Sequence, residues 1–118
     1  MFSHEKLEVY RLSIEFLKAV FELIRRIPSG NADVVKQLRR AVMSIPLNIA
    51  EGAGKTSEGD KKRFYAIARG SALECAALLD LLVTWELIDP PLLTTPRKTL
   101  HSIAAMLSRL SLKTQAYG

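Results

Sequence analysis

Cysteine and histidine are scarce in this sequence, and their scarcity limits the chemistry that the chain can carry. The single cysteine, Cys75, has no partner for a disulfide within the chain, which favours a reducing, cytoplasmic environment. The two histidines, His4 and His101, lie far apart in sequence, and neither belongs to a Glu-x-x-His pattern. Because a metal site needs several ligands that converge, the sequence predicts no metal ion and no other cofactor.

Two local patterns that are typical of enzymes are incomplete. Cys75 lies in an apolar run without a basic residue within one helical turn, which favours a structural role over that of a nucleophile. Segment 52–57 contains Gly-Lys-Thr, as phosphate-binding loops do, but Ile49 stands where such a loop requires its first glycine, and no strand precedes it. We therefore expect no nucleotide site at this loop and no enzyme activity.

Long apolar runs and strand signals are missing too. No apolar run reaches the roughly 18 residues that a membrane-spanning helix requires, and residues 1–6 lack the pattern of a secretory signal. Alternating apolar and polar runs joined by Asn-Gly turns do not occur. These absences predict a soluble, cytoplasmic, all-α protein with no membrane partner.

Apolar residues recur instead every three or four positions, which is the spacing of an amphipathic helix. The pattern predicts helices at about residues 5–27, 31–52, 57–87 and 95–113. Because short connections favour antiparallel neighbours, we predict a single domain, residues 1–118, built as an antiparallel up-down four-helix bundle. Pro46 lies inside the second helix and predicts a kink there, with a break into two helices as the alternative.

Two of the predicted helices carry more apolar surface than one bundle requires. The first has two neighbouring apolar stripes, and the third is apolar or small on nearly every side from Ala66 to Leu87. A helix of the latter kind is expected to be enclosed by other helices. Surplus apolar surface promotes association, so we predict a homo-oligomer.

Five polar residues form a pattern beside the apolar faces of the second and third helices. They are Arg40, Ser44, Asn48 and Glu51 in the second helix and Glu74 in the third. In a hairpin that turns near Gly54, Arg40 faces about Gly70, one helical turn from Glu74. We interpret the five as a semi-buried ion pair and hydrogen-bond network that fixes the helix register. A functional polar pocket is the alternative.

Positive charge is concentrated in one part of the chain. The net charge is +5, and residues 25–69 alone hold ten basic and four acidic residues, a net charge of +6. A local surplus of this kind favours an anionic partner, and we predict weak, salt-sensitive RNA binding through phosphate contacts. A solvated surface without a partner is the alternative. The candidate contact residues are Lys36, Arg39, Lys55, Lys61, Lys62 and Arg63.

Two segments carry a resemblance to a known family. Residues 37–52 and 64–74, QLRRAVMSIPLNIAEG and FYAIARGSALE, together with Leu7-Glu8-Val9-Tyr10, resemble bacterial four-helix bundle proteins named for intervening sequences in 23S ribosomal RNA genes. The likeness covers about residues 5–88. It implies a four-helix bundle that forms ring-shaped homo-oligomers, often pentamers, so a pentamer is the first choice here.

The resemblance also bears on function. A similar bundle serves as an RNA-associated accessory protein in diversity-generating retroelements. We therefore predict a non-enzymatic, oligomeric helical bundle that binds RNA or another nucleic acid weakly through a basic surface. The alternative is a protein-protein interaction or scaffold protein with no nucleic-acid role.

Overall fold

The computed structural model describes residue 4 and residues 7–112 of the 118-residue chain. Among the described residues, the helical elements of more than one residue are four α-helices and one short 3-10 helix, and no strand occurs. The elements are α1 (Glu8–Ile24), α2 (Ala32–Ala53), α3 (Glu58–Thr84), η2 (Pro90–Leu93) and α4 (Thr94–Leu112). The all-α, four-helix prediction is therefore confirmed.

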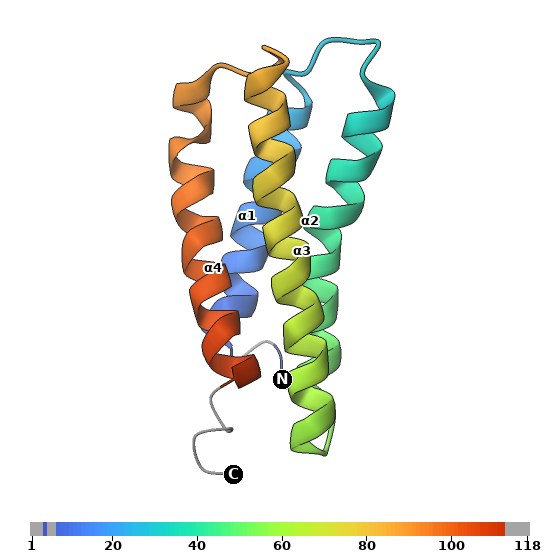
Figure 1. Ribbon diagram of the computed structural model, residues 1–118, viewed down its shortest axis with the longest axis vertical. Helices are drawn as coiled ribbons and strands as arrows, with labels where there is room; N and C mark the ends of the chain where they lie inside the picture. The colour runs from blue at the N-terminus through green and yellow to red at the C-terminus, as the bar shows by residue number, and fades with distance from the viewer. Residues whose placement is uncertain (1–3, 5–6, 113–118) are drawn as a thin grey trace.

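The four helices lie side by side along the long axis of the molecule (Figure 1). Their connections alternate between the two ends: α1 joins α2 at the upper end in the figure, α2 joins α3 at the lower end, and α3 joins α4 at the upper end again. The main packing pairs are α1 with α2, α2 with α3, α3 with α4, and α1 with α4. Each helix thus has two main neighbours, and α3 lies across the bundle from α1.

The core forms where the apolar stripes of the four helices meet. Side chains that are essentially inaccessible to solvent come from every helix, and they include Phe16, Leu38, Ile45, Leu79 and Leu107. Helix α2 continues through Pro46, which is itself buried. The alternative of two separate helices on either side of Pro46 is therefore wrong.

Several predicted helix ends differ from the observed ones. α1 ends at Ile24 rather than at residue 27, and α3 ends at Thr84 rather than at residue 87. After α3, Glu86 takes a left-handed conformation with φ of 56°, and the Leu87 amide donates back to the Leu82 carbonyl at 2.8 Å. This six-to-one hydrogen bond is a Schellman closure, which ends a helix although no glycine is present.

The remaining predicted ends lie near the termini or after η2. Helix α4 begins at Thr94, directly after η2, which is one residue before the predicted start at residue 95. The predicted outer limits at residues 5 and 113 lie outside the described residues. At the start of α3, Ser57 is the N-cap, and its side chain accepts a hydrogen bond from the Asp60 amide at 3.1 Å.

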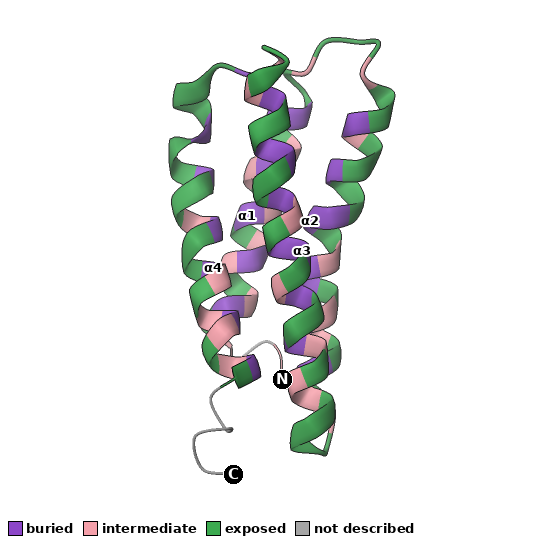
Figure 2. Ribbon diagram, viewed as in Figure 1, coloured by how far each residue is buried: buried purple, intermediate pink, exposed green. Residues whose placement is uncertain are grey.

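Within the single chain, helix α3 is not enclosed on all sides. Ile67, Leu73 and Leu81 are 43%, 51% and 38% exposed. Only α2 and α4 flank the helix, so its third side faces solvent, and Figure 2 shows exposed segments along this side. The apolar surplus of the sequence is thus present on the surface of the single chain.

Candidate nucleic-acid interface and polar contacts

The six predicted basic residues fall into two groups that α2 separates along its length. Lys36 and Arg39 lie in the first half of α2, whereas Lys55, Lys61, Lys62 and Arg63 lie at or after its other end. At 1.5 Å per residue, roughly 24 Å of helix separates Arg39 from Lys55. The structure therefore does not bring the six residues into one surface.

The group at the α2–α3 turn is largely engaged within the chain. The Lys55 ammonium is 3.6 Å from a Glu51 carboxylate oxygen and 5.1 Å from the centre of the Phe64 ring. The Arg63 guanidinium lies 4.6 Å from the centre of the same ring, and one of its nitrogens is 3.7 Å from Asp60. Both cations thus have a nearby carboxylate and an aromatic face.

Lys61 has a structural contact that the sequence pattern did not reveal. Its ammonium donates a hydrogen bond to the Ala53 carbonyl at 3.1 Å, at the last residue of α2. A cation at this position satisfies a free carbonyl and stabilises the negative end of the helix dipole. Residues 51–63 hold four basic and three acidic residues, a net charge of only +1. The turn is therefore a weak attractor of anions.

The larger surplus lies at the opposite end of α2. Residues 25–40 hold five basic residues and one acidic residue, a net charge of +4. The Arg39 guanidinium lies 5.6 Å from the centre of the Phe21 ring, which places the outer faces of α1 and α2 side by side. Arg25 follows Phe21 by one turn, and Lys36 precedes Arg39 by one turn. We call Arg25, Lys36 and Arg39, all of which are exposed, the basic strip.

The ion pairs of this region leave most of the strip unneutralised. Arg25 is 3.0 Å from Glu22 on the same helix. Lys36 and Arg39 form no ion pair within the described part of the chain. Neighbouring exposed cations without carboxylate partners are the arrangement that attracts phosphate groups.

The polar stripe of α2 meets α3 at two separate points. At the first, an Arg40 guanidinium nitrogen lies 3.0 Å from a Glu74 carboxylate oxygen, and the Gln37 amide donates to the same oxygen at 3.1 Å. The contact is direct, as the predicted pairing of Arg40 with Glu74 requires. The side chains of Arg40 and Glu74 are 62% and 35% exposed. The pair is therefore more exposed than the semi-buried one that was predicted.

At the second point, hydroxyl and amide groups connect the helices. The Ser44 and Ser71 hydroxyl oxygens are 2.7 Å apart, and the Asn48 amide donates to the Ser44 carbonyl at 2.8 Å and to its hydroxyl at 3.0 Å. Ser71 was missed because serine is common on helix surfaces, and nothing in its spacing sets it apart. Glu51, which was predicted to join this network, pairs with Lys55 instead.

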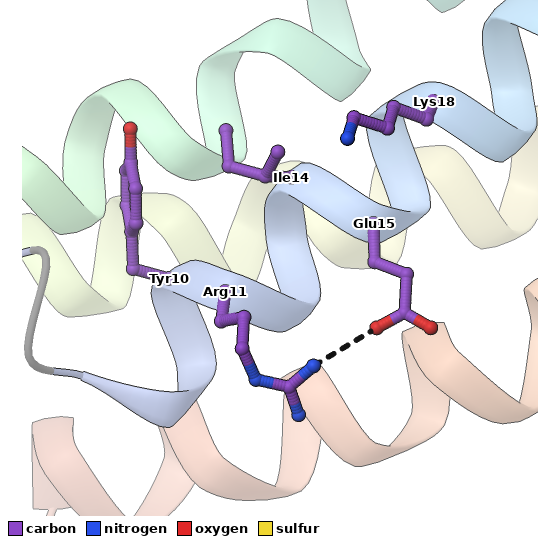
Figure 3. A pocket seen from close by; sticks show the side chains of 5 residues that line it. All are labelled: Tyr10, Arg11, Ile14, Glu15 and Lys18. Atoms are coloured by element: carbon purple, nitrogen blue, oxygen red, sulfur yellow. Dashed lines mark hydrogen bonds and ion pairs between the residues drawn. The ribbon is translucent and has the colours of Figure 1, made fainter.

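A surface hollow of about 440 Å³ lies along α1, but its side chains do not converge (Figure 3). All of its lining residues come from one helix: Tyr10, Arg11, Ile14, Glu15 and Lys18. Arg11 and Glu15 are 3.4 Å apart, and they point away from Tyr10 and Ile14. Among the described residues, no three His, Cys, Asp or Glu side chains gather as metal ligands. This hollow offers no reacting constellation.

The thiol of Cys75 is fully buried in the core. Burial raises the pKa of Cys75 to about 12, and the nearby Glu74 carboxylate adds to the increase. A thiol with such a pKa is protonated at neutral pH and is a poor nucleophile. Its position therefore supports the structural role.

These observations define a class of protein: a four-helix bundle that exposes both basic and apolar side chains. No helix in the described part of the chain is both long and apolar enough to cross a membrane. The chain belongs to the 23S rRNA-intervening sequence protein family, which it matches over residues 5–109. The family resemblance of the two sequence segments is thereby confirmed. A comparison with curated proteins found no match.

Proposed function

We propose that this protein is a non-enzymatic, homo-oligomeric bundle that binds RNA weakly through the basic strip. The observation that carries the proposal is the exposed pair Lys36 and Arg39, which has no ion-pair partner in the described chain, in a region of net charge +4. The turn group contributes less, because three of its four cations have contacts within the chain. Among the six predicted contact residues, Lys36 and Arg39 therefore rank first.

The chemistry of the strip favours phosphate contacts over base recognition. Phe21 is the aromatic side chain nearest to the strip, but Arg39 covers its ring and the residue is only partly exposed. Phosphate contacts carry no sequence information, so binding is expected to be nonspecific and to weaken with salt. A homo-oligomer would repeat the strip on every subunit and raise its avidity.

The test is a titration of labelled single-stranded RNA at several salt concentrations. The variant Lys36→Glu with Arg39→Glu is expected to weaken binding and to lower the slope of log K against log salt by about 0.7 for each lost contact. Lys98→Glu with Arg109→Glu is the matched control, because it makes the same charge change on α4. A variant with Lys61, Lys62 and Arg63 changed to glutamate measures the turn group.

The outcomes separate local binding from general attraction. A loss of affinity in the Lys36/Arg39 variant that exceeds the loss in the control supports the strip. Equal losses in both variants contradict it, because they reflect net charge alone. If the wild type fails to bind RNA even at low salt, the nucleic-acid proposal is wrong.

The second candidate is a protein-protein interaction or scaffold role without nucleic acid. Leu47, Trp85 and Leu73 favour it, since these large apolar side chains are 61%, 56% and 51% exposed. Exposed apolar side chains are typical of surfaces that contact other proteins. Assembly of the wild type without any RNA binding would favour this candidate.

Several finer features belong to the same proposal. They are the antiparallel up-down topology, a kink of α2 at Pro46, and a cytoplasmic location. The alternating connections in Figure 1 support the antiparallel topology. The family resemblance makes a pentamer the first choice for the stoichiometry. A measured mass in solution tests the stoichiometry, and solution NMR couplings across α2 test the kink.

A further inference from the structure

The solvent side of α3 carries a continuous apolar ridge. We define the ridge as the exposed residues that follow one another at three- and four-residue spacing along this side: Ala66, Gly70, Leu73, Ala77 and Leu81. Leu73 and Leu81 are the large members, and they are 51% and 38% exposed. Trp85, the C-cap of α3, lies instead beside the start of α2, where it lines a surface hollow with residues 30–34. The ridge lies on the side of α3 that neither α2 nor α4 covers (Figures 1 and 2).

The charged side chains beside the ridge are paired within the chain. On the α2 side, Glu74 accepts from Arg40 at 3.0 Å. On the α4 side, an Asp80 carboxylate oxygen lies 3.1 Å from Arg97, and the Arg69 guanidinium donates to the Ser108 hydroxyl at 2.7 Å. Each charged residue of α3 between Ala66 and Leu81 thus has a polar contact within the chain, so covering the ridge leaves none of these three without a partner, which lowers the desolvation cost of association.

The order of large and small residues makes the ridge complementary to itself. When two copies of α3 pack antiparallel about a two-fold axis near residues 75 and 76, residue numbers that are equally far from the axis meet. Leu81 then meets the partner's Gly70, and Leu73 meets the partner at position 78, one residue from the partner's Ala77. Each large side chain faces a small one or lies one residue from it, which favours close packing of two helices.

Charge complementarity also favours this antiparallel pairing of two α3 helices. A two-fold axis of this kind keeps the α4 sides of both copies on one side of the contact. Arg69 and Asp80 both point to α4, as their contacts with Ser108 and Arg97 show. In the paired register, Arg69 lies about 3 Å along the axis from the partner's Asp80. Two such oppositely charged pairs, related by the symmetry, flank the contact.

We propose that the ridge is an isologous interface through which two copies of this chain associate. The inference rests on the self-association proposed above and names its surface and symmetry. The 16 residues from Ala66 to Leu81 span about 24 Å, and a helix is about 10 Å wide, so the contact is smaller than a standard interface. It therefore yields a reversible dimer in the micromolar range. Where a ring closes through another face, the ridge joins rings in pairs.

The test uses Gly70→Leu, because a side chain at this position meets no atom of its own chain. A Cβ atom built on Gly70 has nothing within 4 Å. The leucine is thus tolerated by the single bundle but collides with the partner's Leu81 in the pair. Gly59→Leu is the matched control, since Gly59 also lies in α3, has the same free space and is outside the ridge. Thermal unfolding verifies that both variants are folded.

A second variant tests the register by rescue. Gly70→Leu combined with Leu81→Ala exchanges the large and small positions, so the introduced leucine faces the introduced alanine across the axis. Sedimentation velocity from ~1 to ~100 μM measures the dissociation constant of each variant. We expect Gly70→Leu to weaken association at least ~10-fold, the double variant to recover most of it, and Gly59→Leu to match the wild type.

Three results would each overturn a different part of the proposal. Association that Gly70→Leu leaves unchanged refutes the ridge while self-association through another face stands. Loss in Gly70→Leu without recovery in the double variant refutes the antiparallel register. A wild type that is monomeric at every concentration refutes both the ridge and the proposed oligomer, and RNA binding by that monomer would be measured independently.

Discussion

The inner and outer faces of α3 are both apolar, yet they meet different surroundings. On the inner face, Ala68, Leu79 and Leu82 are completely buried against the other helices. On the outer face, Leu73 and Leu81 remain in contact with solvent. The comparison teaches that apolar composition alone does not reveal whether a residue stabilises the bundle or is available to a partner. The two roles are separable by experiment.

The largest expected difference between the faces is that between two leucine truncations. Leu79→Ala removes a fully buried side chain, so it is expected to lower the free energy of unfolding by roughly 2–5 kcal/mol. Leu73→Ala removes a half-exposed side chain and is expected to lower it by less than about 1 kcal/mol. Urea unfolding at a concentration where the chain is monomeric measures both. Similar losses would contradict the distinction.

Two glycine substitutions are expected to act in opposite directions. A Cβ atom on Gly52 would lie 2.9 Å from a ring carbon of the buried Tyr65, so Gly52→Ala is expected to cost about 1–3 kcal/mol of stability. A Cβ atom on Gly70 meets nothing, so Gly70→Ala is expected to stabilise the helix by up to about 1 kcal/mol. Thermal unfolding measures the stability of both variants. If both substitutions stabilise the protein or both destabilise it, the packing described for these two glycines is contradicted.

The buried thiol on the inner face of α3 also predicts that the stability of the protein depends on pH in the alkaline range. Burial raises the pKa of Cys75 from its ordinary value of 9.0 to about 12 in the folded chain. Between these values the unfolded chain releases the proton and the folded chain keeps it. Stability therefore falls as the pH rises above 9, by up to about 1.4 kcal/mol per pH unit. Below pH 9 both states are protonated and the group contributes no slope.

The control for this dependence is Cys75→Ala, which removes the titrating group. Burial also raises the pKa of Tyr65, so some alkaline sensitivity is expected in both proteins. The informative quantity is the difference in free energy of unfolding between wild type and variant from pH 8 to pH 11. Parallel curves would show that the thiol does not titrate as its burial requires.

The smallest expected effect on stability comes from removing the ion pair at the boundary between the two faces of α3. The Arg40–Glu74 pair is exposed to the extent of 62% and 35%, and ion pairs near the surface contribute less than about 1 kcal/mol. Glu74→Ala is therefore expected to change the melting temperature only slightly, whereas the semi-buried reading of the sequence implied a cost near 3 kcal/mol. Differential scanning calorimetry distinguishes the two values.

Much of the fold could be predicted because the information is local. The spacing of apolar residues locates four helices, and Ser57 marks the start of α3 through its own side chain. The end of α3 could not be located as well, because Glu86 adopts a left-handed conformation that usually requires glycine or asparagine. Its closure depends on backbone hydrogen bonds to Leu82 and Val83 rather than on residue type.

The candidate sites were less predictable because they depend on neighbours far apart in sequence. Charge counting found the surplus at residues 25–69, but not that Lys61 caps α2 or that Glu51 neutralises Lys55. The spacing of α2 indicated the contact of Arg40 with Glu74 but not its exposure. The exposure of the ridge follows from the number of helices around α3, which no local pattern contains.

Light scattering of the purified wild-type chain at increasing concentration tests the central claim most directly. The outer face of α3 is an interaction surface in this account, so the mean mass is expected to exceed the 13.1 kDa of one chain and to increase through the micromolar range. A mass of 13.1 kDa at every concentration would contradict the account, because the ridge would then remain in contact with solvent.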